Sequence, residues 1–173
     1  MSSVTDYADK VLAGEIIAGE HVRNSCKRHK KDLKRDDIYF DTDAVKRLEG
    51  FFSQVLSLSE GQFEGKPFDL EPSQKFIVGS IFGWKRKDGT RRFRRAFIEM
   101  GKGNGKSPLS AGIGLYGLMA DSENGAQIYA AAAKRDQAMI TFNDAVNMVR
   151  QSPALEERVT PSGINPVWNL ADL

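Results

Sequence analysis

A glycine-rich stretch in the middle of the chain combines residue types that bind phosphate. From Met100 to Ser107 it reads MGKGNGKS, and its second half matches the P-loop pattern G-x-x-x-x-G-K-S/T. Met100 replaces the first glycine of that pattern, but Gly101 and Gly103 permit the positive φ angles that turn successive N–H groups inward. We expect Lys106 to neutralise the β- and γ-phosphates of ATP, and the Ser107 hydroxyl to ligate Mg²⁺.

The whole loop contributes to this predicted site, and Lys102 adds a second positive charge inside it. Pro108 agrees with a helix that begins near Lys106, because proline suits the first helical turn. The alternative is a surface turn that contains Gly-Lys-Ser by chance, and a strand before the loop with a helix after it favours phosphate binding. The predicted nucleotide-binding residues of the loop are Gly101, Lys102, Gly103, Asn104, Gly105, Lys106 and Ser107.

The elements around the loop predict an α/β fold. Residues 92–99 have the composition of a strand, and a helix is expected from Ser107 to Met119. Residues 126–132 read as a buried strand, followed by a helix over 137–150. This order indicates a P-loop core in which the two strands are neighbours in a parallel sheet, with the loop at the end of the first.

The first 90 residues are predicted to form a mainly helical extension, and residues 91–173 the first part of the P-loop core. Asp41 to Asp43 precede apolar residues at helical spacing, as an N-cap does. Glu71-Pro72 opens a further helix, and Asp88-Gly89 marks a turn. The earlier expected helices cover 5–13 and 20–35.

Composition is ordinary for a globular domain, with 173 residues, 40% hydrophobic and 28% charged. Cys26 is the only cysteine, which excludes an intrachain disulfide and fits an intracellular setting. We see no secretory signal at the N-terminus and no apolar run of membrane-spanning length.

Charge is unevenly distributed along the chain. The net charge is +2, but the segment from Lys85 to Lys106 holds nine basic residues against Asp88 and Glu99, and so carries +7. This excess suggests an anionic partner, such as phosphate or nucleic acid, although a solvated basic face has the same composition.

His21, Cys26 and His29 are a weak candidate for a metal site. They lie on one charged predicted helix without a fourth ligand, which makes a poor zinc site. We expect Cys26 to be buried and both histidines to be solvated.

Besides the loop, six stretches resemble a known family. They occur in the same order as in that family and extend over nearly the whole chain. They are Gly14–Gly19, Cys26–His29, Phe68–Ile77, Ile81–Trp84, Arg91–Ala96 and Ile128–Ala138. With them the chain resembles the large terminase subunits of tailed phages and prophages, in their N-terminal ATPase portion. In that family a degenerate first glycine of the P-loop is common.

The resemblance implies a DNA-packaging motor in the cytoplasm of a bacterial host. Such a motor hydrolyses ATP with Mg²⁺ and drives double-stranded viral DNA into the capsid, and a C-terminal nuclease domain cuts the DNA. The implied partners are the small terminase subunit, the portal protein and further copies in a ring, with no membrane.

Two residues outside the loop receive roles from the resemblance. Gln74 lies in a segment similar to an adenine-recognition element, and its amide suits the N6 and N7 edge of adenine. Its alternative role is that of a solvent-facing helix residue. Arg135, beside Lys134, is a candidate charge donor to a neighbouring subunit's nucleotide, with a surface salt bridge as the alternative.

One required feature of a P-loop ATPase is missing from the sequence. We find no apolar strand ending in Asp-Glu after the loop, which would hold the metal and orient water. In the family this strand follows beyond the segment Val167–Leu173. We therefore expect a fragment that binds nucleotide weakly and hydrolyses ATP barely or not at all. The alternatives are a helicase-like P-loop ATPase fragment and an inactive nucleotide- or DNA-binding remnant.

Overall fold

The computed structural model divides the chain into two compact units that interleave in sequence. The first comprises Met1–Glu49 and Leu70–Ile98, and the second comprises Gly50–Asp69 and Glu99–Leu173. The residues that the structure describes are 2–59, 61–123, 125–161 and 168–170. No helix among them has the length and apolar character needed to cross a membrane.

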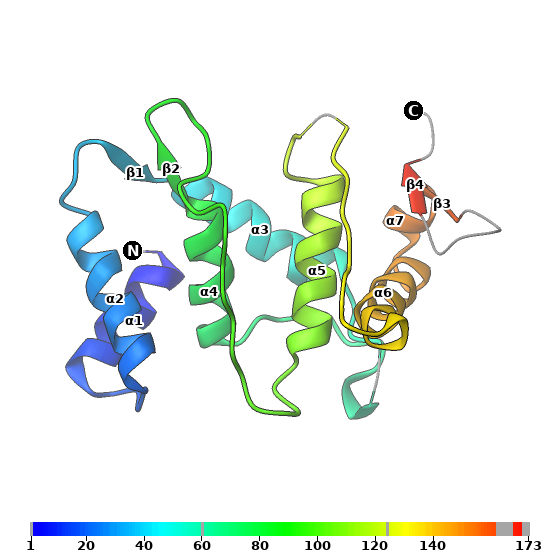
Figure 1. Cartoon of the computed structure of the whole chain (residues 1–173), viewed down its shortest axis with the longest axis horizontal. Coiled ribbons are helices and arrows are strands. Elements are labelled where there is room, and N and C mark those ends of the chain that lie inside the picture. The colour runs from blue at the N-terminus through cyan, green and yellow to red at the C-terminus, as the bar shows by residue number, and fades with distance from the viewer. Residues whose placement is uncertain (1, 60, 124, 162–167, 171–173) are drawn as a thin grey trace. The chain divides into compact units, whose positions relative to one another are not determined.

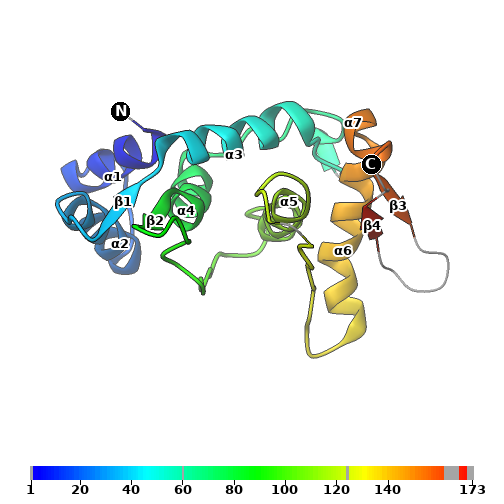
Figure 2. The ribbon, with the colours of Figure 1, turned by 90° about the horizontal axis from the view of Figure 1, so that it is seen from above.

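The first unit is built mainly from three helices, α1 (Ser3–Ala13), α2 (Glu20–Asp32) and α4 (Pro72–Gly83). In both views α1 and α2 lie side by side, and α1 also packs against α4 (Figures 1 and 2). A short antiparallel ladder, β1 (Ile38–Phe40) with β2 (Trp84–Arg86), completes the unit.

Local chemistry explains where these helices begin and how closely they pack. The Ser2 hydroxyl accepts a hydrogen bond from the Thr5 N–H at 3.2 Å and caps α1. α1 ends at Ala13, and its C-cap Gly14 has a φ of 84°. Gly79 of α4 allows a close approach to α1, because a Cβ at that position would lie 2.3 Å from Val4 Cγ2.

The second unit contains α5 (Lys106–Met119), α6 (Arg135–Arg150) and the short α7 (Pro153–Glu156). α5 packs against α6, as Figure 1 shows. The unit also holds a 3₁₀ helix (Gly61–Phe63) and the antiparallel pair β3 (Val159–Pro161) and β4 (Trp168–Leu170).

The long helix α3 (Thr42–Val55) contributes its first part to the first unit and its last part to the second. In the second unit Gly112 of α5 faces this last part, because a Cβ there would lie 2.5 Å from Phe52 Cε1. The rings of Phe51 and Tyr116 meet edge to face at 5.5 Å, and those of Phe52 and Phe68 at 5.1 Å. These contacts form the apolar core beside α5.

The predicted helices are confirmed with small shifts at their ends. The helix after the loop begins at Lys106 rather than Ser107, the next one begins at Arg135 rather than 137, and α2 ends at Asp32 rather than 35. Asp41 caps α3 as expected, because its Oδ1 accepts from the N–H groups of Asp43 and Ala44 at 3.1 and 2.9 Å.

The two predicted strands, and with them the parallel sheet, do not appear in the structure. Within the described residues, 92–99 and 126–132 belong to no ladder, and the sheets there are two antiparallel pairs. A strand needs a neighbouring strand to satisfy its N–H and C=O groups, whereas composition reports only the apolar character of its side chains. Phe97 and Tyr129 are accordingly 92% and 81% exposed.

The C-terminal segment Val167–Leu173, beyond which the missing carboxylate strand is expected, lies largely outside the described residues. Of that segment the structure describes only β4.

Candidate functional site

The glycine-rich loop enters α5 through two glycines in the left-handed region. Gly103 has a φ of 83°, and Gly105, the N-cap of α5, has a φ of 70° and a ψ of 25°. Other residues adopt this conformation only with strain, so both positions need glycine. The Leu109 N–H donates to the Gly105 carbonyl at 3.0 Å, which closes the first turn of the helix.

Gly101 has a different role from the one that its type suggests. Its φ is not among the positive ones, and the positive φ angles of the loop occur at Gly103 and Gly105 instead. The Asn104 side-chain amide donates to the Gly101 carbonyl at 3.2 Å, and a Cβ at Gly101 would lie 3.1 Å from that nitrogen. Gly101 thus leaves room for a side chain that bridges the loop.

The Lys106 ammonium folds back over the loop. Its Nζ donates to the carbonyl oxygens of Met100 and Gly101 at 2.6 and 2.9 Å, and the residue is half-buried. A positive charge is thereby held against the loop. Phosphate oxygens are charged acceptors and form stronger hydrogen bonds than carbonyl oxygens, so they can replace these two partners.

The backbone N–H groups of the loop are available as donors. Those of residues 102–107 donate to no acceptor within the described residues. The N–H groups of Lys106 and Ser107 stand at the N-terminus of a 14-residue helix, where the helix dipole favours an anion. That these groups converge on one point remains a prediction.

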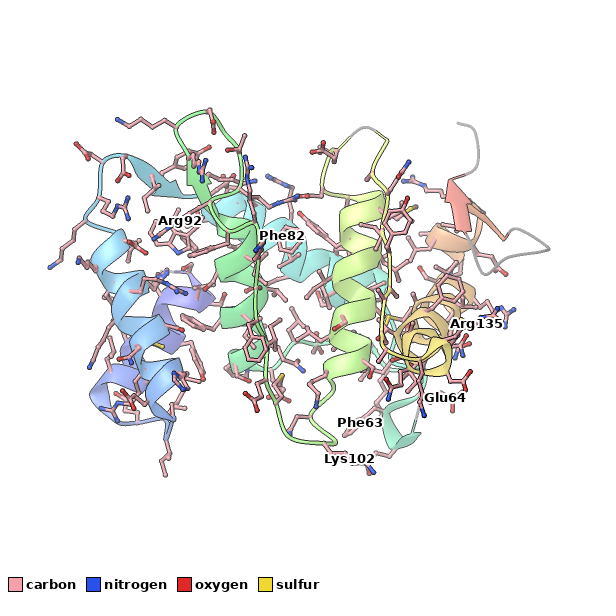
Figure 3. All side chains as sticks on the ribbon, viewed as in Figure 1. Phe63, Glu64, Phe82, Arg92, Lys102 and Arg135 are labelled. Carbon is pink, nitrogen blue, oxygen red and sulfur yellow. The ribbon has the colours of Figure 1, made fainter. Side chains whose placement is uncertain are left out.

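The two remaining polar side chains of the loop differ in position. Lys102 is exposed and points away from the loop, as Figure 3 shows. Ser107 is half-buried in the first turn of α5, and its hydroxyl makes no hydrogen bond to a described residue. Its oxygen can therefore serve as a ligand for a hard cation such as Mg²⁺.

Gln74 lies in the first unit, at the third position of α4. It is 7% exposed, so its alternative role as a solvent-facing residue is wrong. Its Oε1 accepts from the Glu71 N–H at 3.0 Å and forms a capping box with the Glu71 side chain. The spacing of Glu71-Pro72 and Gln74 could have indicated this structural role from the sequence.

Arg135 is the first residue of α6 and is exposed (Figure 3). Neither it nor Lys134 pairs with a carboxylate among the described residues, so the alternative of a surface salt bridge is not seen there. The guanidinium is accessible from solvent.

The positions of the two histidines and the cysteine on α2 show that one prediction, a solvated His29, is wrong. Cys26 is fully buried, as predicted, and His21 is exposed, but His29 is only 2% exposed. Its Nε2 lies 3.0 Å from the Thr5 hydroxyl, and its Nδ1 accepts from the Trp84 indole N–H at 3.2 Å. Its position three residues after Cys26 puts both on one helix face, which could have indicated this burial.

A cavity of about 780 Å³ lies beside the loop's helix in the second unit. It is lined by α5, α6 and residues 126–131, mainly with apolar side chains. Ile128 lies against α5, because Cβ atoms at Gly114 and Gly117 would stand 3.2 and 3.3 Å from its side chain. This cavity was not predicted from the sequence, where Gly114 and Gly117 on α5 are a local signal for it.

Comparisons with known proteins agree on one family. The profile of the family described as "Terminase large subunit, ATPase domain" matches residues 72–162. The large terminase subunit of Enterobacteria phage HK97 is 34% identical over 120 residues, which make up 68% of this chain and 23% of that protein. The crystal structure of the HK97 large terminase superposes with a TM-score of 0.61 at 30% identity, covering 72% of this chain and 24% of that one. The chain thus spans about a quarter of the relative that it matches.

Proposed function

The chain belongs to the family of terminase large subunits, in their ATPase domain, and on that premise we propose that residues 101–107 bind ATP in a motor that packages phage DNA. The observation that carries the proposal is the position of the Lys106 ammonium, held against a loop whose N–H groups have no described acceptor. A triphosphate would supply the anionic oxygens that both the ammonium and these donors need.

Four loop residues have a defined task in this proposal. Lys106 exchanges the carbonyls of Met100 and Gly101 for oxygens of the β- and γ-phosphates. Gly103 and Gly105 keep the backbone in the conformation that exposes its N–H groups. The unbonded Ser107 hydroxyl fits a Mg²⁺ ligand, and the ion would neutralise phosphate charge when bound.

Binding is tested by calorimetry with ATP and Mg²⁺ on the purified chain. We expect Lys106→Ala to weaken binding by about 100-fold, because the loss of charged hydrogen bonds costs about 3 kcal/mol. Lys102→Ala is the matched control, since it removes the same charge from an exposed position in the same loop. Its effect should be less than about 5-fold, in line with the low value of exposed charges. Equal affinities of Lys106→Ala and the unmodified chain would refute the assignment of the P-loop.

We propose that the chain binds ATP but hydrolyses it very slowly. The loop contacts are already present in the ground state, whereas hydrolysis also needs a carboxylate that orients water in line with the γ-phosphate. We found no strand context for that carboxylate in the sequence. Phosphate release should therefore be close to background, with and without DNA. Rapid release that Lys106→Ala abolishes would show that a catalytic carboxylate is present.

We propose that Gln74 contributes to the recognition of adenine. Gln74→Glu provides a sharp test, because glutamate also forms a capping box but lacks the amide donor. The variant should keep its thermal stability and lose the preference for ATP over GTP. An unchanged preference would restrict Gln74 to its capping role.

Arg135 is proposed to act on the nucleotide of a neighbouring copy. Its exposure and its lack of a described carboxylate partner support this role. In analytical ultracentrifugation, Arg135→Ala should leave ATP binding unchanged and reduce any ATP-dependent self-association. Retention of that self-association would contradict the proposal.

The sheet of a P-loop ATPase is proposed to include residues 92–99 and 126–132 as parallel strands in the packaging motor. The close packing of Ile128 on Gly114 and Gly117 supports a strand beside the loop's helix. Hydrogen exchange tests this, because amides of 127–131 should become protected when ATP is bound. Rapid exchange in every state would contradict it.

The wider setting is also proposed from the family. It comprises double-stranded viral DNA as substrate, the small terminase subunit and portal protein as partners, and the host cytoplasm as location.

A further inference from the structure

Helix α2 carries an exposed row of basic side chains. From Glu20 to Arg35 the chain has seven basic residues and two acidic ones. Lys30 pairs with Asp9 at 2.7 Å, and Arg35 pairs with Asp32 and Asp37. Arg23, Lys27 and Lys31 are exposed and form no ion pair with a described carboxylate. Their spacing of four residues places them on one helix face.

This row is connected to a second basic segment of the same unit through Phe93. The guanidinium carbon of Arg28 lies 5.0 Å from the centre of the Phe93 ring, and that of Arg92 lies 4.8 Å from it. Such distances are typical of cation–π contacts. Arg94 and Arg95 follow directly and are exposed. α2 and residues 93–95 therefore form a joined basic surface.

Arg92 does not belong to this exposed surface. Its guanidinium forms an ion pair with the buried Asp32 carboxylate and lies 5.7 Å from the Trp84 ring, so its charge is already compensated. The basic surface is accordingly defined as the exposed basic residues of α2 and of residues 93–95 that form no ion pair with a described carboxylate. These are Arg23, Lys27, Arg28, Lys31, Arg94 and Arg95.

We propose that this basic surface binds the phosphate backbone of double-stranded DNA. The inference rests on the proposed function, which makes duplex DNA the substrate. From Arg23 to Lys31 the row extends about 12 Å along the helix axis, and a duplex presents about seven phosphate charges over that length. Flexible lysine and arginine side chains on one helix face suit contacts that do not depend on sequence.

The aromatic content of the surface favours a duplex over a single strand. Single-stranded nucleic acids are bound by stacking bases on exposed aromatic rings. Phe93 is half-buried and already lies against two guanidinium groups, so it offers no free face for a base. The exposed face of α2 and residues 93–95 therefore provide charge without a free aromatic ring, and the nearest exposed ring along the chain is Phe97.

The test is fluorescence anisotropy with a short labelled duplex of mixed sequence, in the absence of nucleotide. The variant is Arg23→Gln/Lys27→Gln/Lys31→Gln. The matched control, Lys10→Gln/Lys46→Gln/Lys66→Gln, removes the same charge from exposed positions on other elements. Thermal unfolding of both variants verifies that they fold.

We expect the α2 variant to lose about 10-fold or more in affinity at moderate salt. The slope of log affinity against log salt should fall by about 3, close to one for each lost phosphate contact. The control should stay within about 2-fold of the unmodified chain. Equal losses in the two triple variants would overturn the proposal, because net charge alone would then explain binding.

Two further outcomes would also overturn it. Tighter binding of a single strand than of the duplex would contradict the duplex assignment. Competition by polyglutamate as strong as that by unlabelled duplex would indicate a surface for acidic proteins. Lys106→Ala should leave DNA binding unchanged, so a failure of the nucleotide proposal and a failure of this one are distinguishable.

Discussion

The interior of the first unit and the α5 region of the second unit satisfy their polar and apolar groups in different ways. In the first unit the buried polar groups around α2 bond to other protein groups. His29 contacts Thr5 and Trp84, and Asp32 binds Arg92. In the second unit the loop donors have no described acceptor, and residues 126–131 border a cavity of about 780 Å³.

This contrast indicates that the first unit pairs the buried polar groups around α2 without further partners. Buried polar groups are costly unless they are paired, so a closed network fixes one arrangement of the first unit. In the second unit the exposed N–H groups of the loop have no described acceptor and can exchange water for further partners, such as the proposed phosphates. Substitutions in the two regions should therefore differ strongly in their effect on stability.

The largest loss of stability is expected for Arg92→Met in the first unit. The Asp32 side chain is 4% exposed, and without Arg92 its remaining ion-pair partner among the described residues is Arg35, at 3.4 Å. Removal of one member of a buried ion pair costs about 3–5 kcal/mol. Urea unfolding measures the loss, and Arg94→Met, at an exposed position, serves as the control. Similar stabilities of the two variants would show that the buried pair does not stabilise the unit.

A fall in pH should have the next largest effect, through His29. Burial lowers the pKa of His29 from 6.5 to about 4, and the nearby Lys30 adds to the shift, against Asp32 and Asp9. Below pH 6.5 the unfolded chain binds a proton that the folded chain excludes until about pH 4, so stability is lost as pH falls through this window. Between pH 7 and pH 5 the loss should be about 2 kcal/mol. His29→Gln should remove this part of the pH dependence, and an unaltered profile in that variant would assign it to other groups.

Gly112→Ala probes the core of the second unit, where packing is close. The added Cβ would lie 2.5 Å from Phe52 Cε1 and 3.1 Å from Leu56 Cδ1. Overpacking of this kind outweighs the gain in helix propensity, and we expect a net loss of about 1–2 kcal/mol. Gly117→Ala is the control on the same helix, because its nearest neighbour is the end of the Ile128 side chain at 3.3 Å. In chemical denaturation the free energy of unfolding should be higher for Gly117→Ala than for Gly112→Ala. The reverse order would be inconsistent with this packing.

The smallest effect on stability is expected at Tyr129, which lines the cavity of the second unit. Its ring is 81% exposed, and its hydroxyl donates to Gln127 Oε1 at 2.7 Å on the surface. Tyr129→Ser should change the free energy of unfolding by no more than about 0.5 kcal/mol, as for most surface substitutions. A loss of 2 kcal/mol or more would mean that residues 126–131 are already packed in the free chain, and the contrast between the two regions would disappear.

Local chemistry allowed much of the helical structure and the loop to be predicted. Asp41, Glu71-Pro72 and the glycines before Lys106 act on backbone groups within a few residues, so their effect can be read from neighbouring letters. The same reasoning does not account for residues 92–99 and 126–132, which form no ladder in the structure. Their apolar composition is that of strands, but a ladder requires partners that lie elsewhere in the chain.

The sequence by itself thus determined the presence of the helices, the positive φ at Gly103 and the family, whereas it placed several helix ends up to three residues away and expected a positive φ at Gly101 rather than at Gly105. Only the tertiary structure decided that His29 is buried against Trp84, that Asp32 binds Arg92 and that Lys106 folds back onto Met100 and Gly101. The physical reason is the range of the interactions. Capping and turn preferences act between near neighbours, whereas the burial of a charge depends on groups that folding brings together from distant positions.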